Sequence, residues 1–285
     1  MSDGRALARA YLEQQRLLGT DAVALPADAE VVSPAAGPVA AGAPGSRPGS
    51  GDSPPPTSGV VHLTPGVSPG KDEKRDPVSG LPAAGLTYDP PAQDLFSSDP
   101  VQRATTLADI AELVSSCTKC RLCEARNNTV PGEGAERARL VVVGEGPGKT
   151  EDETGRPFVG KAGELLTKIL SAIGLAREQV YICNVVKCRP PENRTPQYDE
   201  IAACVPYLFR QIELLAPGVI LAMGNTAAQT ILNTKQSLGA LRSKVHRFRG
   251  IPVIVTYHPA ALLRNPNWKK PTWDDVRIAH RLLDG

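Results

Sequence analysis

Cysteines are the residues of this sequence whose types and spacing most clearly suggest chemistry. Cys117 and Cys120 are separated by two residues, and Cys188 and Cys204 by fifteen. Two thiolates two residues apart can bind one metal centre from a single turn, and a distant pair can complete the coordination after folding. We expect these four to be the ligands. Zinc and a [4Fe–4S] cluster both accept four thiolates, so the spacing does not select the metal.

Two further cysteines complete the set of six. Cys123 lies three residues beyond Cys120 and is its main competitor as a ligand. Cys183 falls in an apolar segment and is interpreted as a buried thiol. The N-terminal segment lacks the pattern of a secretory signal, so we expect an intracellular chain with metal-bound or free thiols instead of a disulfide framework.

A glycine-rich turn and an aromatic loop are candidate binding segments. Residues 144–148 read Gly-Glu-Gly-Pro-Gly, and Gly144 and Gly146 would let backbone N–H groups approach an anion closely. The segment matches neither a Walker loop nor a dinucleotide fingerprint, and an ordinary tight turn is the alternative. Phe158 lies in the loop 157–163, where its ring could stack on a nucleobase or simply anchor the loop.

Asn184 and His258 are the two remaining polar candidates. Asn184 lies in an apolar, β-branched segment, and its amide offers the acceptor and donors that a nucleobase edge requires. A bond to the backbone is the alternative. His258 directly follows another apolar segment, where an imidazole could stabilise negative charge on a leaving group. An inert loop histidine is the alternative.

The elements that must position these residues alternate along the chain. Apolar segments predict strands over 140–143, 180–186, 219–223 and 253–257, and helical spacing predicts helices over 107–114, 162–173, 196–215, 224–232 and 272–283. This order predicts an α/β fold with three layers, α/β/α, around a central, mostly parallel, four-stranded sheet. Ligands bind at the carboxyl ends of such strands, so we expect the glycine turn, Asn184 and His258 at one rim.

The N-terminal part of the chain has a different composition. We predict a short amphipathic helix over 1–22, a disordered linker rich in Pro, Gly, Ala and Ser over 23–103, and one folded domain over 104–285. The helix or linker could dock on a protein partner. No apolar run is long enough to span a membrane, so we expect no membrane association.

Charge alone does not identify a partner, because 32 Lys and Arg balance 30 Asp and Glu to a net charge of +2. Basic residues nevertheless gather in the last third of the chain, at Arg242, Lys244, His246, Arg247, Arg249, Arg264, Lys269 and Lys270. Such a cluster could contact phosphates, or it could be an ordinary basic face.

Taken together, the segments 144–163, 181–191 and 257–260 resemble the family-four uracil-DNA glycosylases. The resemblance covers about residues 107–283 and implies an α/β/α glycosylase domain with a [4Fe–4S] cluster on four cysteines. It implies base excision repair: hydrolysis of the N-glycosidic bond of deoxyuridine in single- and double-stranded DNA, which releases uracil and leaves an abasic site. A monomeric enzyme of the bacterial cytoplasm is expected.

The resemblance also implies roles for individual residues. Phe158 would stack on the flipped uracil, and Asn184 would read its Watson–Crick edge. His258 would face uracil O2 as negative charge develops there, and Glu145 would orient or activate the water.

Other positions of the substrate site follow from the same motifs. Gly144 and Gly146 would line it, and Glu151 would help exclude the C5-methyl group of thymine. Relatives place Asp or Asn where this chain has Gly146, which leaves backbone groups as alternative activators of the water. Residues 189–203 contain no His, so we expect turnover and not the covalent attachment to DNA of a related branch.

One hypothesis of a different class competes with the enzyme. The chain could be a metal-stabilised DNA-binding module without catalysis, tethered to a replication or repair complex through its N-terminal region.

Overall fold

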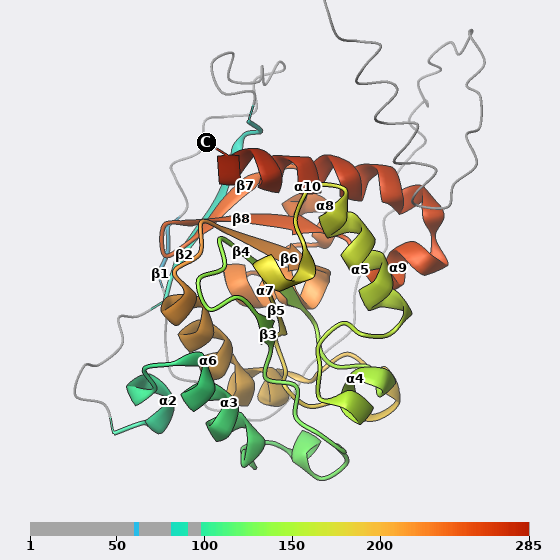
Figure 1. Ribbon diagram of the computed structural model, residues 1–285. Coiled ribbons are helices and arrows are strands. Elements are labelled where there is room, and N and C mark those ends of the chain that lie inside the picture. The colour runs from blue at the N-terminus through green and yellow to red at the C-terminus, as the bar shows by residue number, and fades with distance from the viewer. Residues whose placement is uncertain (1–59, 63–80, 91–97, 285) are drawn as a thin grey trace, which may run out of the picture. The chain divides into compact units, whose positions relative to one another are not determined.

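The computed structural model describes residues 60–62, 81–90 and 98–284 (Figure 1). The predicted helix over 1–22 and most of the predicted linker lie outside these residues. The strands are β1 (Val60–His62), β2 (Ala84–Asp89), β3 (Glu133–Gly134), β4 (Leu140–Gly144), β5 (Tyr181–Asn184), β6 (Val219–Met223), β7 (Val245–Phe248) and β8 (Ile251–Thr256).

The helices alternate with these strands over most of the chain. The α-helices are α2 (Pro100–Arg103), α3 (Leu107–Ser115), α4 (Lys149–Thr154), α5 (Lys161–Ser171), α6 (Tyr198–Leu215), α7 (Asn225–Leu232), α8 (Leu238–Leu241), α9 (Pro259–Arg264) and α10 (Lys269–Asp284). Short 3₁₀ turns are η1 (Arg121–Cys123), η2 (Arg177–Gln179), η3 (Pro191–Asn193) and η4 (Pro266–Trp268). None of the helices in the described ranges is both long and apolar enough to cross a membrane.

The four predicted strands form the parallel centre of one sheet, so the α/β prediction is confirmed. The strand order is β1-β2-β7-β8-β6-β4-β5-β3, and β5, β4, β6 and β8 are parallel neighbours. All residues of β4, β5 and β6 are buried, as expected for strands covered on both faces. The register places Gly144 beside Asn184 and Met223 beside Thr256, so these strands end together.

The predicted number of four strands is wrong, because the residues that the structure describes form a sheet of eight. Strands β3 and β7 pair antiparallel with β5 and β8, and β2 extends the β7 edge in parallel. The extra strands are short or partly exposed, and Arg247 and Arg249 interrupt the apolar pattern around β7. Their sequences therefore carry little strand signal of their own.

The structure also differs from the predicted linker at β2, which lies inside 23–103. Tyr88 is buried there against Phe248, with ring centroids 6.1 Å apart. The backbone N–H of Leu86 donates to His246 Nδ1 at 2.8 Å. The short run that holds Leu86 and Tyr88 lies among Pro- and Gly-rich segments, so it carries little strand signal. Its link to the rest of the sheet is the pairing with β7, far along the chain.

Helices cover the sheet in layers. Alternate strand residues such as Val141, Ile220 and Val253 share one hydrophobic core with buried side chains of α3, α6 and α7. The residues between them, such as Val142 and Leu221, point to the opposite face. There α10 packs along β6 and β8 (Figure 1). The carboxyl ends of the central strands lie between these layers and support the loops described below.

Candidate functional site

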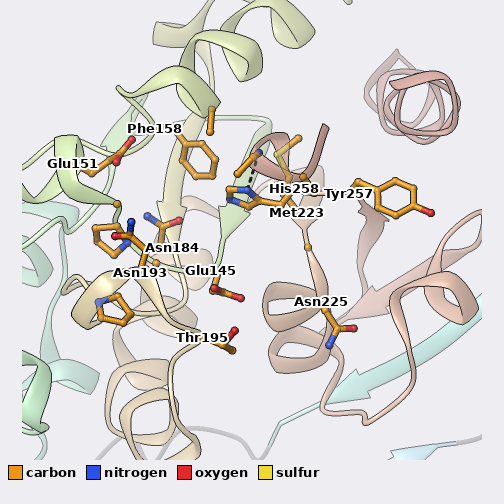
Figure 2. Close-up of a pocket in the computed structure, with 18 of the residues that line it drawn as sticks. Glu145, Glu151, Phe158, Asn184, Asn193, Thr195, Met223, Asn225, Tyr257 and His258 are labelled. Carbon is orange, nitrogen blue, oxygen red and sulfur yellow. Dashed lines mark hydrogen bonds between the residues drawn. The ribbon is translucent and has the colours of Figure 1, made fainter. Parts of the chain in front are cut away.

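A cleft of about 550 Å³ opens at the carboxyl ends of the parallel strands. It is lined by most of the residues that the sequence singled out: Glu145, Gly146, Glu151, Phe158, Asn184 and His258. Figure 2 shows the rings of Phe158 and His258 and the amide of Asn184 gathered on one side of this cleft. The topology thus brings residues from three separate motifs to one rim.

Asn184, the last residue of β5, presents an unpaired acceptor. The residue is only 1% exposed, and its Oδ1 has no hydrogen-bond partner among the described residues. A buried acceptor without a donor costs about 1–3 kcal/mol, a cost that a ligand N–H would remove. The amide fits only because residue 144 is glycine: a Cβ there would lie 2.4 Å from Oδ1 of Asn184 and 2.5 Å from Cζ of Phe158.

His258 is held as a neutral hydrogen-bond donor beside Phe158. The two ring centroids are 5.3 Å apart. The backbone N–H of Ala260, in the first turn of α9, donates to Nδ1 of His258 at 3.2 Å, which leaves the proton of the neutral ring on Nε2. Burial, reinforced by the positive charge of Arg264, lowers the pKa of His258 to about 4. At neutral pH the ring therefore offers Nε2–H without a positive charge.

The loop that carries Phe158 is held in a conformation that this residue type rarely adopts. Phe158 has φ of 52°, in the left-handed region, which costs a bulky residue about 1–3 kcal/mol. Arg177 of η2 donates from Nη1 to the Phe158 carbonyl at 2.9 Å and from Nη2 to the carbonyl of Pro157. A Cβ on Gly163 would lie 1.8 Å from the same Phe158 carbonyl, so only glycine fits beneath the loop.

Glu151 of α4 holds the loop from its other side. Its Oε1 accepts the backbone N–H groups of Val159 at 2.9 Å and Gly160 at 3.0 Å. Its carboxylate thus holds the backbone that orients Phe158. Glu151 also lines the cleft, and its part in excluding the C5-methyl group of thymine stays a prediction. Arg177 and Glu151 together form what we call the Phe158 clamp.

Glu145 is the second residue of the glycine turn, and its carboxylate faces the cleft (Figure 2). The hydroxyl of Thr226, in the first turn of α7, donates to Glu145 Oε2 at 2.5 Å. This bond fixes one oxygen and leaves the other available to a water or ligand. Gly146 allows the turn to lie close to the segment after β5, because a Cβ there would lie 2.8 Å from Cγ2 of Val186.

A second, smaller pocket is lined by five of the six cysteines: Cys117, Cys120, Cys123, Cys188 and Cys204. The sixth, Cys183, is buried inside β5 as predicted. No three His, Cys, Asp or Glu side chains in the described ranges form a ready site for a single metal ion. A cluster of several irons is larger than one ion, so its ligand sulfurs lie further apart. Five thiols around one pocket fit such a group, and both candidates, Cys120 and Cys123, are within its lining.

The surroundings of these sulfurs also suit bound anionic thiolates. Arg126 donates from Nη1 to Cys188 Sγ at 3.2 Å, and the backbone N–H of Lys187 donates to Cys204 Sγ at 3.3 Å. Hydrogen bonds and cations of this kind stabilise thiolate ligands. Burial raises the pKa of Cys188, and that of Cys204 to about 12, so neither sulfur is activated as a nucleophile.

Lys187 connects the cysteine pocket to the cleft. Its side chain is fully buried and donates to the backbone carbonyl of Asn184 at 2.8 Å and to Gln211 Oε1 at 2.6 Å. The backbone N–H of Lys187 itself donates to Cys204 Sγ. The end of β5 is therefore tied to α6 and to the cysteine pocket through one residue.

Sequence reasoning missed several residues that shape the site. Arg177 lies outside the glycine-rich motifs and acts only on loop carbonyls, so no local pattern marks it. Thr226 was hidden in a predicted helix. Tyr257 belongs to the segment 257–260 that carries the resemblance, but it was given no role, and Trp268 was not singled out. Both line the cleft, and the aromatic and basic residues after 256 were the available signal.

Comparisons with known proteins agree with this geometry. The family model described as the uracil DNA glycosylase superfamily matches residues 131–278. The type-4 uracil-DNA glycosylase of Sulfurisphaera tokodaii is 48% identical over 186 residues, 62% of this chain and 84% of that protein. The type-4 enzyme of Thermotoga maritima is 52% identical over 158 residues, 55% of this chain and 82% of that protein. The chain therefore belongs to the type-4 uracil-DNA glycosylases of this superfamily.

Proposed function

We propose that the cleft hydrolyses the N-glycosidic bond of a deoxyuridine that has been flipped out of single- or double-stranded DNA. Uracil excision in DNA repair is the activity of the family to which the chain belongs. The observation that carries the assignment to this cleft is the unpartnered Oδ1 of Asn184, buried beside the rings of Phe158 and His258. The chain acts as a monomer in this proposal.

Recognition of the base offsets the cost of extracting it. Flipping a nucleotide out of the duplex costs a few kcal/mol, and least for a mismatched base. Phe158 stacks on the extruded ring, and Asn184 accepts N3–H at Oδ1 while its amide N–H donates to O4. This pairing fits uracil and rejects cytosine, which has no N3–H and carries an amino group in place of O4.

The chemistry needs a donor where charge develops and a positioned water. The water oxygen bonds to C1′ as the C1′–N1 bond breaks, and the electron pair leaves with the uracil as an anion. His258 donates Nε2–H to uracil O2, where the negative charge gathers. Glu145, held by Thr226, orients the water and takes its proton.

One of two neighbouring leucines is suited to fill the gap left in the base stack. Leu262 and Leu263 both belong to α9, the helix that follows His258. Leu262 is 1% exposed and belongs to the interior, whereas Leu263 is 49% exposed on α9. We assign the wedge to Leu263, as apolar side chains serve elsewhere between base steps.

The cysteine pocket is proposed to hold a [4Fe–4S] cluster on Cys117, Cys120, Cys188 and Cys204. When bound, the cluster supplies structural cross-linking and no step of the hydrolysis. Arg126 and the Lys187 backbone orient and stabilise the two buried sulfurs. The cross-link fixes the end of β5, and with it Asn184.

A uracil-release assay on single- and double-stranded oligonucleotides with one deoxyuridine tests the proposal. We expect free uracil and an alkali-labile abasic site, and no release of thymine or cytosine from matched oligonucleotides. Tight DNA binding without any release of uracil would favour the non-catalytic module instead. Family membership does not favour that alternative.

The Phe158 clamp leads to a further expectation. Arg177→Ala should lower kcat/KM for uracil excision about 10- to 100-fold, because small misplacements of a substrate-positioning group cost up to that factor. Arg177→Lys, which keeps one donor, should recover part of the loss. Single-turnover excision kinetics with the melting temperature as a second readout would measure this.

Arg156→Ala is the matched control for the clamp. Arg156 lies next to the same loop, but its guanidinium pairs with Glu133 at 2.6 and 2.8 Å and not with loop carbonyls. Its excision kinetics should stay near those of the unmodified protein. If both arginine variants lose the same activity, the clamp does not position Phe158.

A further inference from the structure

The cleft has a second aromatic part beyond the proposed uracil site. Tyr257 directly precedes His258, and its side chain points away from Asn184 and Phe158 (Figure 2). Trp268 of η4 stacks on Tyr257, with ring centroids 4.6 Å apart and an interplanar angle of 4°. Both rings line the same cleft as the uracil site. This stack has no role in the chemistry described above.

The stack is rigidly supported from behind. Arg242 covers the Tyr257 ring, with Cζ 4.3 Å from its centroid. Buried Asp275 accepts from Arg242 Nε at 2.7 Å and from the Thr256 hydroxyl at 2.8 Å. Three planar groups are thus layered from the interior toward the surface, and the outermost is Trp268.

Trp268 remains accessible although Tyr257 covers one of its faces. It is 36% exposed, one of three large hydrophobic side chains that are exposed in the described residues. Arg264 lines the same cleft, Lys270 follows Trp268 by two residues, and both are exposed. The chain has no Asp or Glu between His258 and Trp273. An accessible indole among cations is the combination that binds single-stranded nucleic acid, by stacking and phosphate attraction.

We propose that Trp268 is a stacking platform for an unpaired base that neighbours the flipped uracil on the same strand. This inference rests on the proposed function, because it needs a uracil-containing strand in the cleft. The platform would matter most on single-stranded DNA, where neighbouring bases are free to leave their own stack. The preformed Tyr257–Arg242 support spares the cost of ordering the indole when DNA binds.

A fluorescent base reports the contact directly. Single-stranded oligonucleotides would carry 2′-fluoro-deoxyuridine, which resists hydrolysis. Each would also carry one 2-aminopurine, either directly 5′ or directly 3′ of the 2′-fluoro-deoxyuridine. We expect quenching by the bound protein to be strongest at one position. Trp268→Leu, which still covers Tyr257, should abolish that quenching and weaken binding about tenfold, within the range of one stacked base. Trp268→Phe should restore both.

Tyr198→Leu is the control for a general loss of exposed aromatic surface. Tyr198 is 79% exposed at the start of α6 and is not part of the cleft lining. Quenching that persists in Trp268→Leu, or that is lost equally in Tyr198→Leu, would overturn the platform. Failure of the unmodified protein to release uracil would overturn the proposed function instead, and uracil release without position-specific quenching would overturn the platform alone.

Discussion

Replacing His258 with alanine should lower the rate of uracil excision about 10²- to 10³-fold, the usual cost of removing one donor from an oxyanion site. DNA affinity should change less than about tenfold, because the bond from Nε2–H strengthens only as charge reaches uracil O2. The measurement is single-turnover excision, paired with fluorescence anisotropy on a 2′-fluoro-deoxyuridine oligonucleotide.

His280→Ala is the matched control, because His280 lies on α10 and pairs with Asp284 at 2.7 Å, outside the cleft lining. It should leave both excision and binding unchanged. Equal losses of rate and affinity in His258→Ala would indicate that the ring supports the loop structure and not the transition state.

The same residue determines an expected pH dependence. With the pKa of His258 lowered to about 4, roughly one ring in a thousand is protonated at pH 7. If the neutral ring is the donor, excision should not accelerate as pH falls from 8 to 5.5. If the imidazolium were the active form, the rate would rise about tenfold per pH unit over that range.

The free energy of unfolding should also depend on pH through His258. The unfolded chain, with an ordinary histidine pKa near 6.5, binds the His258 proton more readily than the folded chain does. The free energy of unfolding therefore decreases as pH drops from about 6.5 toward 4.

The rim of the site could be predicted because it depends on short-range patterns. Apolar runs mark the strands, and parallel strands end at a common edge, so the sequence predicts Asn184 and His258 at one rim. The expected strand 219–223 matches β6, and the expected helix 107–114 matches α3 to within one residue.

The contacts that hold the site could not be predicted in the same way. The Phe158 clamp consists of side chains bonded to backbone groups 8, 9, 19 and 20 residues away. Such bonds depend on how the loop folds back, and no residue spacing encodes that. Strand β2 was missed for a related reason, since its stability comes from β7, more than 150 residues later. Likewise, only burial distinguishes Leu263 from Leu262.

Loss of a cysteine ligand from the cysteine pocket should have the largest effect on the stability of the folded state. Metal binding to a structural site contributes about 10–16 kcal/mol in small zinc domains, comparable to the whole stability of a typical domain, about 5–15 kcal/mol. Losing a buried ligand should therefore cost the cluster and the fold together. We expect Cys188→Ala to yield colourless protein with little bound iron and a greatly lowered melting temperature.

Cys183→Ala is the matched control, because this thiol is equally buried but lies inside β5, away from the pocket. It should keep about four irons per chain, together with the visible absorption. The pair Cys120→Ala and Cys123→Ala then identifies the fourth ligand: only the true ligand should be needed for iron. Brown, folded and active Cys188→Ala protein would remove this residue from the ligand set. Zinc in place of iron would keep the cross-link, because four thiolates bind either metal, but would change the cofactor.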